Sequence, residues 1–535
     1  MRRIIAAAAF AALFSLSTAA PPQPPPKLTV LIVVDQMRAD YVDRFNGEWT
    51  GGLKRMLTQG AWFRQAAYPY LTTVTCPGHA TISTGTFPHV HGVFQNAWWD
   101  REARKQMTCT EDPAAKDVGY GVAATGGDSP YRLQVPTFTD QMRSSRKAHV
   151  VSLSLKARSA IMLGGHGGDA ITWLTETLDG WETAAGYSEK GVPAVKAFVD
   201  ANPVAADLGK TWDRSLPAAS YRGADDAPGE APPQGWTRSF PHVLNGTSDK
   251  ADSTYFGQWE RSPFADAYLG RFAAALVESL QLGKHDGTDV LAISFSSPDL
   301  VGHAFGPRSH EVQDMYAHLD KTLGALFDQL DAMVGKDQWV AGLSADHGVT
   351  PIPEQLIAEG KDGGRINGGA IVDAVEQVLK PALGEGRHII VLNTNDIYFQ
   401  PGVYNKILKS PQLMTSVISA IQSQPGIQRA FRSEEVRGAD QSKDPLLRAA
   451  ALSYFPGRSG DIVFATKTGW MISSAGTTHG SASPDDQRVP ILLLGRGVKP
   501  GAYQDASTPA DLAPTLAALS GLTMKAEGHP LPCLQ

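Results

Sequence analysis

Cysteine is scarce in this sequence of 535 residues, which contains only Cys76, Cys109 and Cys533. None of the three belongs to a C-x-x-C pair, and this spacing argues against a zinc site built from thiolates. In an oxidising compartment one disulfide can form. The sequence does not select the pair, and one cysteine must remain free.

Clusters of positive charge are also missing, and so are long hydrophobic runs beyond the first residues. With 48 Lys and Arg against 54 Asp and Glu, the formal net charge is −6. This balance lacks the basic footprint of a protein that binds nucleic acid. No later stretch approaches the roughly 20 apolar residues that a membrane span needs, so we expect no membrane-spanning segment in the mature chain.

The N-terminus has the pattern of an export signal. Two arginines precede a short apolar run and a group of small residues, and residues 1–19 therefore predict a signal peptide cut after Ala19. A retained membrane anchor is the alternative, but the apolar run is short for a bilayer span. Residues 20–26 form a proline-rich leader. We expect the mature protein to be periplasmic or secreted.

Short apolar runs rich in β-branched residues predict buried strands. They cover residues 27–34, 290–295, 339–343 and 490–494. Amphipathic segments predict helices over residues 51–59, 310–333 and 508–519. This alternation predicts an α/β fold with a mostly parallel central sheet and helices on both faces.

Two long segments separate the predicted strands. Residues 98–289 and 351–471 contain many turn residues and several short elements. We interpret them as insertions that form a cap on one catalytic domain covering residues 27–535. Residues 224–234, rich in Pro, Gly, Ala and Asp, predict a surface loop. The many loop aspartates would allow a structural Ca²⁺ at the surface, although no EF-hand-like spacing appears.

Acidic and imidazole side chains follow several of these strands. In open α/β sheets, ligands bind beyond the carboxyl ends of the strands. Asp299 and His303 are four residues apart, and both can reach one metal if the backbone turns at Gly302 between them. Taken alone, a capping aspartate and a loop histidine would explain this pair equally well.

A second pair, Asp346 and His347, ends another predicted strand, and the glycine that follows helps the chain to bend. Asp35 follows the first strand, and His479 lies in a polar loop. Oxygen and imidazole ligands without sulfur are typical of catalytic zinc with open positions. Two such metals can stabilise both the attacking and the leaving oxygen of a phosphoryl displacement.

Thr75 provides a candidate nucleophile, because its hydroxyl lies at the start of a predicted helix. The residues after it, Cys76-Pro77-Gly78, lead into an apolar, helix-compatible run, which places the hydroxyl near a helix N-terminus. That position favours anions and lowers the cost of an alkoxide, and a nearby metal would lower the hydroxyl pKa further. A plain helix cap is the alternative reading of Thr75 alone.

These features together resemble the alkaline phosphatase superfamily, most closely its PhoK/PafA-type bacterial branch, which has a core related to type I phosphodiesterase/nucleotide pyrophosphatase. The matching stretches are VVDQMRADY, TVTCPGHATISTG, FPHVHGVFQNAWWD, SLKARSAIMLGGHGGDA, SFSSPDLVGHAFGP, LSADHGV, TTHGS and TPADLAPTLAALSGL. They extend from Val33 to Leu522, and their order makes the resemblance specific.

The resemblance implies a role for each of these side chains. One zinc would be held by Asp299, His303 and His479. The other would be held by Asp35, Asp346, His347 and Thr75, with Thr75 as the nucleophile that forms a covalent phosphothreonine.

The resemblance also implies three residues that bind the phosphoryl group. Asn96 would hydrogen-bond one phosphoryl oxygen, and Lys156 and Arg158 would form the K-x-R pair of the monoesterase branch. Arginine offers a planar fork that matches phosphate, and lysine acts as a point charge. Two extra cations favour the more highly charged monoester dianion. We therefore expect a phosphate monoester hydrolase of broad substrate range, with small-molecule phosphate monoesters as its partners.

Three alternatives remain. A phosphodiesterase or nucleotide pyrophosphatase would share the metals, Thr75 and Asn96, but not the K-x-R pair. A sulfatase would need C/S-x-P-x-R, and Cys76-Pro77 lacks both the intervening residue and the arginine. A secreted binding protein on an inactive scaffold would need a missing ligand, and none is missing. Four further histidines that could be taken for ligands, His79, His89, His91 and His166, are interpreted as structural or loop residues. The glycine-rich residues 164–168 are interpreted as a loop.

Overall fold

The computed structural model describes residues 24–124 and 126–535. The predicted signal peptide of residues 1–19 lies outside them. Within the described residues, no helix combines the length and the apolar character needed to cross a bilayer.

A mixed, mostly parallel sheet of ten strands forms the centre of the molecule. In spatial order the strands are β20 (Gly501–Ser507), β2 (Ala61–Ala66), β19 (Ile491–Gly495), β12 (Trp339–Ser344), β1 (Leu28–Val34), β11 (Asp289–Phe295), β6 (Val150–Ser154), β7 (Ala170–Leu174), β8 (Trp181–Ala184) and β5 (Asp117–Gly119). β1 is parallel to both β11 and β12. β19 is antiparallel to β12 and β2, so the predicted strand at 490–494 is present but reverses direction.

β1 is the most central strand of those predicted, and its sequence explains why. All seven of its residues are buried, as expected for a strand covered by helices on both faces. Val30 and Ile32 pack into one hydrophobic cluster, whereas Leu31 and Val33 pack into another. Because successive side chains point to opposite faces of a strand, one apolar run supplies both layers of the core.

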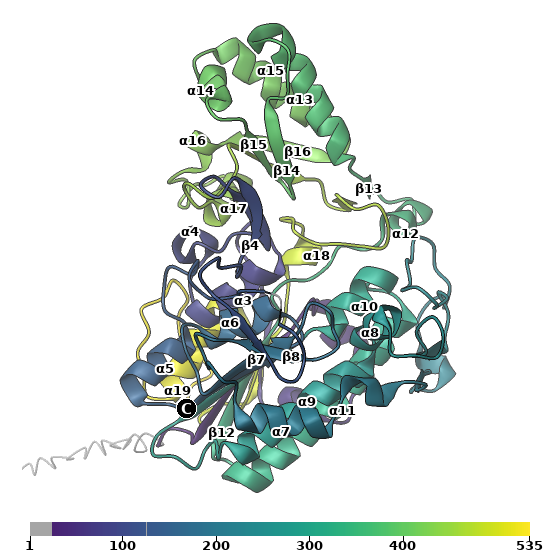
Figure 1. Ribbon diagram of the computed structural model, residues 1–535, viewed down its shortest axis with the longest axis vertical. Coiled ribbons are helices and arrows are strands. Elements are labelled where there is room, and N and C mark those ends of the chain that lie inside the picture. The colour runs from purple at the N-terminus through teal and green to yellow at the C-terminus, as the bar shows by residue number, and fades with distance from the viewer. Residues whose placement is uncertain (1–23, 125) are drawn as a thin grey trace, which may run out of the picture.

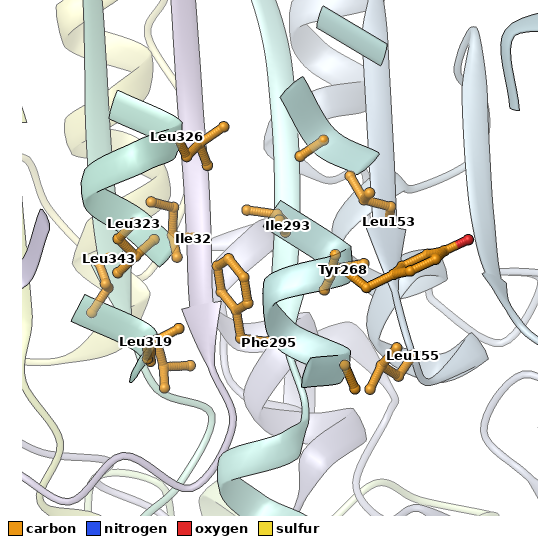
Figure 2. Close-up of a cluster of buried hydrophobic side chains, with 14 of the residues drawn as sticks. Ile32, Leu153, Leu155, Tyr268, Ile293, Phe295, Leu319, Leu323, Leu326 and Leu343 are labelled. Atoms are coloured by element: carbon orange, nitrogen blue, oxygen red, sulfur yellow. The ribbon is translucent and has the colours of Figure 1, made fainter. Parts of the chain in front are cut away.

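Helices cover both faces, as predicted. On one face lie α9 (Pro263–Ser279) and α11 (His310–Leu330), and on the other lie α3 (Thr75–Thr84), α5 (Phe138–Arg146), α6 (Ala157–Gly164) and α19 (Leu512–Leu519). Figure 2 shows Leu319, Leu323 and Leu326 of α11 packed against side chains of the neighbouring strands. Burial of each such leucine stabilises the fold by roughly 1.5–3 kcal/mol.

The prediction that residues 98–289 form an insertion outside the core is wrong in part. Strands β5, β6, β7 and β8 all come from this segment and complete one end of the central sheet. Each of them is short, at three to five residues. Such brief apolar runs carry little periodic signal, so the sequence alone did not separate them from loop.

Residues 351–471 contain a second, smaller sheet with helices of its own, which we call the cap. Their four-stranded antiparallel sheet contains β14 (Ile389–Asn393), β15 (Asp396–Phe399), β17 (Ile462–Thr466) and β16 (Ile427–Arg432). The helices α13 (Gly368–Leu383), α14 (Val403–Leu408) and α15 (Pro411–Gln422) pack on it around a hydrophobic cluster of their own. In Figure 1 this cap forms the upper end of the molecule, opposite the central sheet.

Candidate active site

Three neighbouring strands end at the edge where the predicted site lies. Val34 of β1 pairs with Phe295 of β11, and Val33 pairs with Ser344 of β12, so the three carboxyl ends are level. The residues that follow therefore meet above the sheet. Asp35 directly follows β1, and Asp346 and His347 follow β12 by two and three positions.

Asp299 and His303 do not lie in a turn, as the sequence analysis expected. They lie on α10 (Ser297–Phe305), which begins two residues after β11. Residues four apart on a helix share one face, so the helix itself brings the two side chains together. The distance from Nε2 of His303 to Oδ1 of Asp299 is 3.1 Å, and Nε2 of His479 lies 3.6 Å from the same oxygen.

All three imidazoles are oriented in the same way. Nδ1 of His303 lies 2.8 Å from the carbonyl oxygen of Thr477, and Nδ1 of His479 lies 2.8 Å from that of Thr73. Nδ1 of His347 lies 2.9 Å from its neighbouring carbonyl, that of Gly348. A carbonyl oxygen only accepts, so each Nδ1 carries a proton, and in the neutral imidazole Nε2 is then the atom with a free lone pair. Metal-binding histidines are commonly oriented by such a contact.

Asp35, Asp346 and His347 form a fully buried group. Nε2 of His347 lies 3.5 Å from Oδ1 of Asp35 and 3.3 Å from Oδ2 of Asp346. These three atoms have no hydrogen-bond partner within the described part of the chain. Unpaired polar atoms that are fully buried are costly, and three that face one another fit a shared cation.

The residues present therefore fit a metal pair. The ligand atoms of Asp299, His303 and His479 lie within 4.8 Å of one another, and so do those of Asp35, Asp299 and His347. Because Asp299 belongs to both groups, the two groups are adjacent. Carboxylate oxygens and imidazole nitrogens without thiolate are the donors that catalytic zinc uses.

The electrostatics of the pocket also favour a cation. Burial raises the pKa of Asp35 well above its ordinary value, and the Asp299 and Asp346 carboxylates raise it further. Burial also lowers the pKa of His479 well below its ordinary value, and His347 and His303 add to this effect. His479 is therefore neutral, which is the state in which imidazole binds a metal.

Lys156 places a positive charge inside this acidic pocket. Its Nζ donates to Oδ2 of Asp35 at 2.6 Å and to Oδ2 of Asp299 at 2.5 Å. Burial alone would lower the pKa of Lys156, but the Asp299 and Asp35 carboxylates raise it above its ordinary value. Arg158, two residues further on, has a buried Nε with no hydrogen-bond partner among the residues described. Both cations of the K-x-R pair thus lie at or beside the site.

Thr75 is the first residue of α3 and is buried. The packing of its helix places it near Asp346. A Cβ on Gly78 would lie 2.2 Å from the backbone oxygen of Asp346, so only glycine allows this close approach. His79, one helical turn after Thr75, has Nδ1 at 2.9 Å from the Thr75 carbonyl oxygen and at 3.3 Å from Oδ2 of Asp346.

Asn96 lies against the start of the same helix. Its Oδ1 accepts a hydrogen bond from the backbone N–H of Cys76 at 2.8 Å, which leaves the NH₂ group of the amide as a donor. Cys76 forms a disulfide with Cys109, and Cys533 is the free, buried cysteine. The pairing that the sequence left open is therefore settled. A disulfide-bonded Cys76 also has no thiol to mature, which speaks against a sulfatase.

A cavity of about 340 Å³ opens between these residues and the cap. Asn96, His303 and His479 line it, and so do Thr394 and Trp470 of the cap. The cap therefore faces the place where the rest of a substrate would lie.

The other histidines singled out in the sequence analysis each contact a partner within the protein. His91 is buried against Oγ1 of Thr81, His89 pairs with Glu527, and His166 pairs with Asp140. His79 also contacts Asp346, which was not foreseen. Its spacing of four from Thr75 was the available signal, since it places both on one helix face.

Gln36 is a second residue that the sequence analysis missed. Its backbone N–H donates to Oδ1 of Asp346 at 3.1 Å, and its Nε2 donates to Oδ1 of Asp299 at 2.6 Å. Its place directly after Asp35 was the only signal in the sequence. A side chain that reaches across 263 positions cannot be paired with its partner from one sequence.

Comparison with known proteins defines the class. The model of the family described as type I phosphodiesterase / nucleotide pyrophosphatase matches residues 29–485, and this chain belongs to that family. Its full-length relatives include bacterial alkaline phosphatases. PhoV of Synechococcus elongatus is 31% identical over 500 residues, which cover 92% of this chain and 90% of PhoV. PhoK of Sphingomonas sp is 32% identical over 532 residues, which cover 92% of this chain and 88% of PhoK.

A solved structure supports the same conclusion. The crystal structure of alkaline phosphatase PafA matches with a TM-score of 0.87 and 29% identity, covering 97% of this chain and 100% of that chain. The fold expected from the sequence, and the resemblance to PhoK/PafA-type alkaline phosphatases, are thereby confirmed.

Proposed function

We propose that this chain is a periplasmic or secreted alkaline phosphatase that hydrolyses small-molecule phosphate monoesters with two zinc ions. The observation that carries this proposal is the adjacency of two metal-binding groups that share Asp299, beside a hydroxyl at a helix N-terminus. The alkaline phosphatases similar to this chain support the activity.

We assign one zinc to Asp299, His303 and His479. The other belongs to Asp35 and His347, which also lie close to Asp299, and to Asp346, whose Oδ2 lies 3.3 Å from Nε2 of His347. Thr75 is a further ligand of this second zinc. When bound, the ions would neutralise the buried carboxylates, lower the pKa of the Thr75 hydroxyl and stabilise charge on the attacking and leaving oxygens.

Thr75 is the nucleophile in this proposal. The Thr75 hydroxyl loses its proton to solvent, and its Oγ attacks phosphorus in line with the leaving oxygen. The bond from phosphorus to that oxygen breaks, and the leaving group takes up a proton from solvent. The resulting phosphothreonine is hydrolysed by water, which returns the Thr75 hydroxyl and releases phosphate. The N-terminus of α3 contributes partial positive charge at this point, since the first N–H groups of a helix have no partner within it.

Asn96, Lys156 and Arg158 position the phosphoryl group. The NH₂ of Asn96 is held in place because Oδ1 of the same amide is bound to the Cys76 N–H. Lys156 and Arg158 supply charge for the oxygens that a monoester has in excess of a diester. Catalysis then rests on positioning and on charge stabilisation.

Trapping the covalent intermediate tests the proposal. Rapid acid quench of wild type with a generic aryl phosphate should give a phosphorylated peptide that contains Thr75, identified by mass spectrometry. Thr75→Ala should lose this peptide and nearly all turnover while it keeps its zinc. Near-normal turnover in Thr75→Ala would rule out Thr75 as the nucleophile. Metal analysis of the same samples counts zinc and calcium.

A phosphodiesterase is the second candidate, because the matching family model is described by that activity. The K-x-R pair, Lys156 and Arg158, argues for the monoesterase. Rates measured on a matched monoester and diester separate the two.

A further inference from the structure

We propose that Gln36 is a positioning residue that couples the two metal groups, and that Gly302 provides the space it needs. This inference rests on the proposed two-metal function. It follows from the backbone conformation of Gln36, its two hydrogen bonds and the contact with Gly302.

The backbone of Gln36 is unusual. Its φ is 66°, in the left-handed region, and only 2% of the residue is exposed. Residues other than Gly, Asn and Asp rarely adopt this conformation, and when they do, the surroundings must hold them there. Strained residues of this kind gather at functional sites. Gln36 directly follows the ligand Asp35, so its conformation sets how the chain leaves β1.

The left-handed conformation lets Gln36 hydrogen-bond a carboxylate in each of the two metal groups. The backbone N–H donates to Oδ1 of Asp346, a ligand of one proposed metal. The side-chain NH₂ donates to Oδ1 of Asp299, a ligand of the other. Hydrogen bonds to ligating carboxylates fix their orientation and influence how tightly the metal is held. Gln36 therefore ties the positions of two carboxylates that come from different strand ends.

Gly302 explains why the amide can reach Asp299. It lies inside α10, where glycine weakens a helix relative to alanine. A Cβ at this position would lie 1.8 Å from Oε1 of Gln36 and 2.9 Å from its Cδ. No side chain fits there unless the amide moves away. The glycine that the sequence analysis assigned to a turn thus serves as the space for the Gln36 side chain.

Gln36→Gly gives a sharp test, because glycine adopts the left-handed conformation freely. This variant keeps the backbone N–H for Asp346 and removes the side chain that donates to Asp299 and fills the space over Gly302. Zinc release into a colorimetric chelator should then become biphasic. We expect the equivalent held by Asp299, His303 and His479 to leave about 10–100-fold faster than in wild type, with the other unchanged. Excess zinc should restore much of kcat.

Further variants separate positioning from a purely structural role. Gly302→Ala should act in the same direction as Gln36→Gly. Gly257→Ala is the matched control, since a Cβ there would meet only an arginine side chain at 3.7 Å. The metal-free Gln36→Gly protein should unfold at the same or a higher temperature than metal-free wild type.

The outcomes discriminate clearly. If wild type holds two zinc equivalents and Gln36→Gly releases both at wild-type rates, the inference is wrong. It is also wrong if metal-free Gln36→Gly is destabilised and both equivalents are released faster to the same extent, since Gln36 would then be merely structural. If wild type itself does not hold two equivalents, the proposed function fails instead.

Discussion

The backbone N–H of Cys76 donates to Oδ1 of Asn96, and the disulfide partner of Cys76, Cys109, donates its own N–H to the carbonyl oxygen of Asn96 at 2.9 Å. The two half-cystines therefore hold the side chain and the backbone of Asn96, the residue proposed to bind the phosphoryl group. The disulfide links the residue after Thr75, the proposed nucleophile, to the segment that follows Asn96.

Removing this disulfide should weaken both stability and substrate binding. We expect Cys76→Ser with Cys109→Ser to lose about 2–4 kcal/mol of unfolding free energy, since a loop closed across 33 positions is released. KM for a monoester should rise more than kcat falls, because Asn96 loses its orientation. Urea denaturation and steady-state kinetics measure the two effects. The reductant TCEP should lower the unfolding free energy of Cys533→Ala as much as that of wild type. It should leave the unfolding free energy of the double variant unchanged.

Lys156 and Arg158 should set the preference for monoesters. Lys156→Ala with Arg158→Ala should reduce kcat/KM for an aryl monoester by about 10²–10³-fold, because two charged contacts are lost. By the same reasoning, kcat/KM for a diester should fall by less than about tenfold. Both rates are measured on samples of equal zinc content, with exposed Lys196→Ala as the control. Equal losses on the two substrates would contradict the assignment.

Metal removal should destabilise the protein. Asp35, Asp299 and Asp346 share one buried pocket, and without a metal ion only the single charge of Lys156 opposes their mutual repulsion. A ligand at about 100 times its Kd contributes about 2.7 kcal/mol, so a chelator should lower the melting temperature by several degrees. In Asp346→Asn the chelator should have a clearly smaller effect, while in exposed Asp200→Asn it should match wild type. A chelator effect unchanged in Asp346→Asn would remove this residue from the metal site.

Stability should also fall as pH rises because of a second pair of buried carboxyls, those of Glu311 and Glu230. Burial raises the pKa of Glu311 to about 9, and burial with the nearby Glu311 carboxyl raises that of Glu230 to about 8. The pKa of the adjacent His242 is lowered to about 4 by burial, so this histidine stays neutral. A pKa raised in the folded state means that folding retains protons. The stability that these retained protons contribute is complete below the unfolded pKa of about 4.3. It is lost as pH rises through about 8–9.

Glu311→Gln tests this directly, since it keeps the shape and cannot ionise. The unfolding free energy of Glu311→Gln minus that of wild type should increase by about 1–3 kcal/mol from about pH 5 to about pH 9. Urea titrations across that range measure the difference. Glu278→Gln, an exposed change on α9, should follow the wild-type pH profile. A Glu311→Gln profile parallel to wild type would show that Glu311 does not carry this pH dependence.

Much of the fold could be predicted because its signals are local. The apolar run of β1 and the long helix α11 are continuous in sequence, and their periodicity is set by backbone geometry. The short strands β6 and β7 and the reversed direction of β19 escaped prediction. Their pairing partners are chosen by packing between segments far apart in the chain.

By itself the sequence determined the chemistry available at the site, through residue types at the ends of strands: carboxylates, imidazoles and a threonine before a helix. Only the tertiary structure decided how those groups are held. It placed Asp299 and His303 on a helix, paired Cys76 with Cys109, and set Gln36 between two carboxylates. The physical reason is that ligand types are properties of single residues, whereas orientation depends on contacts that close only when distant strands align.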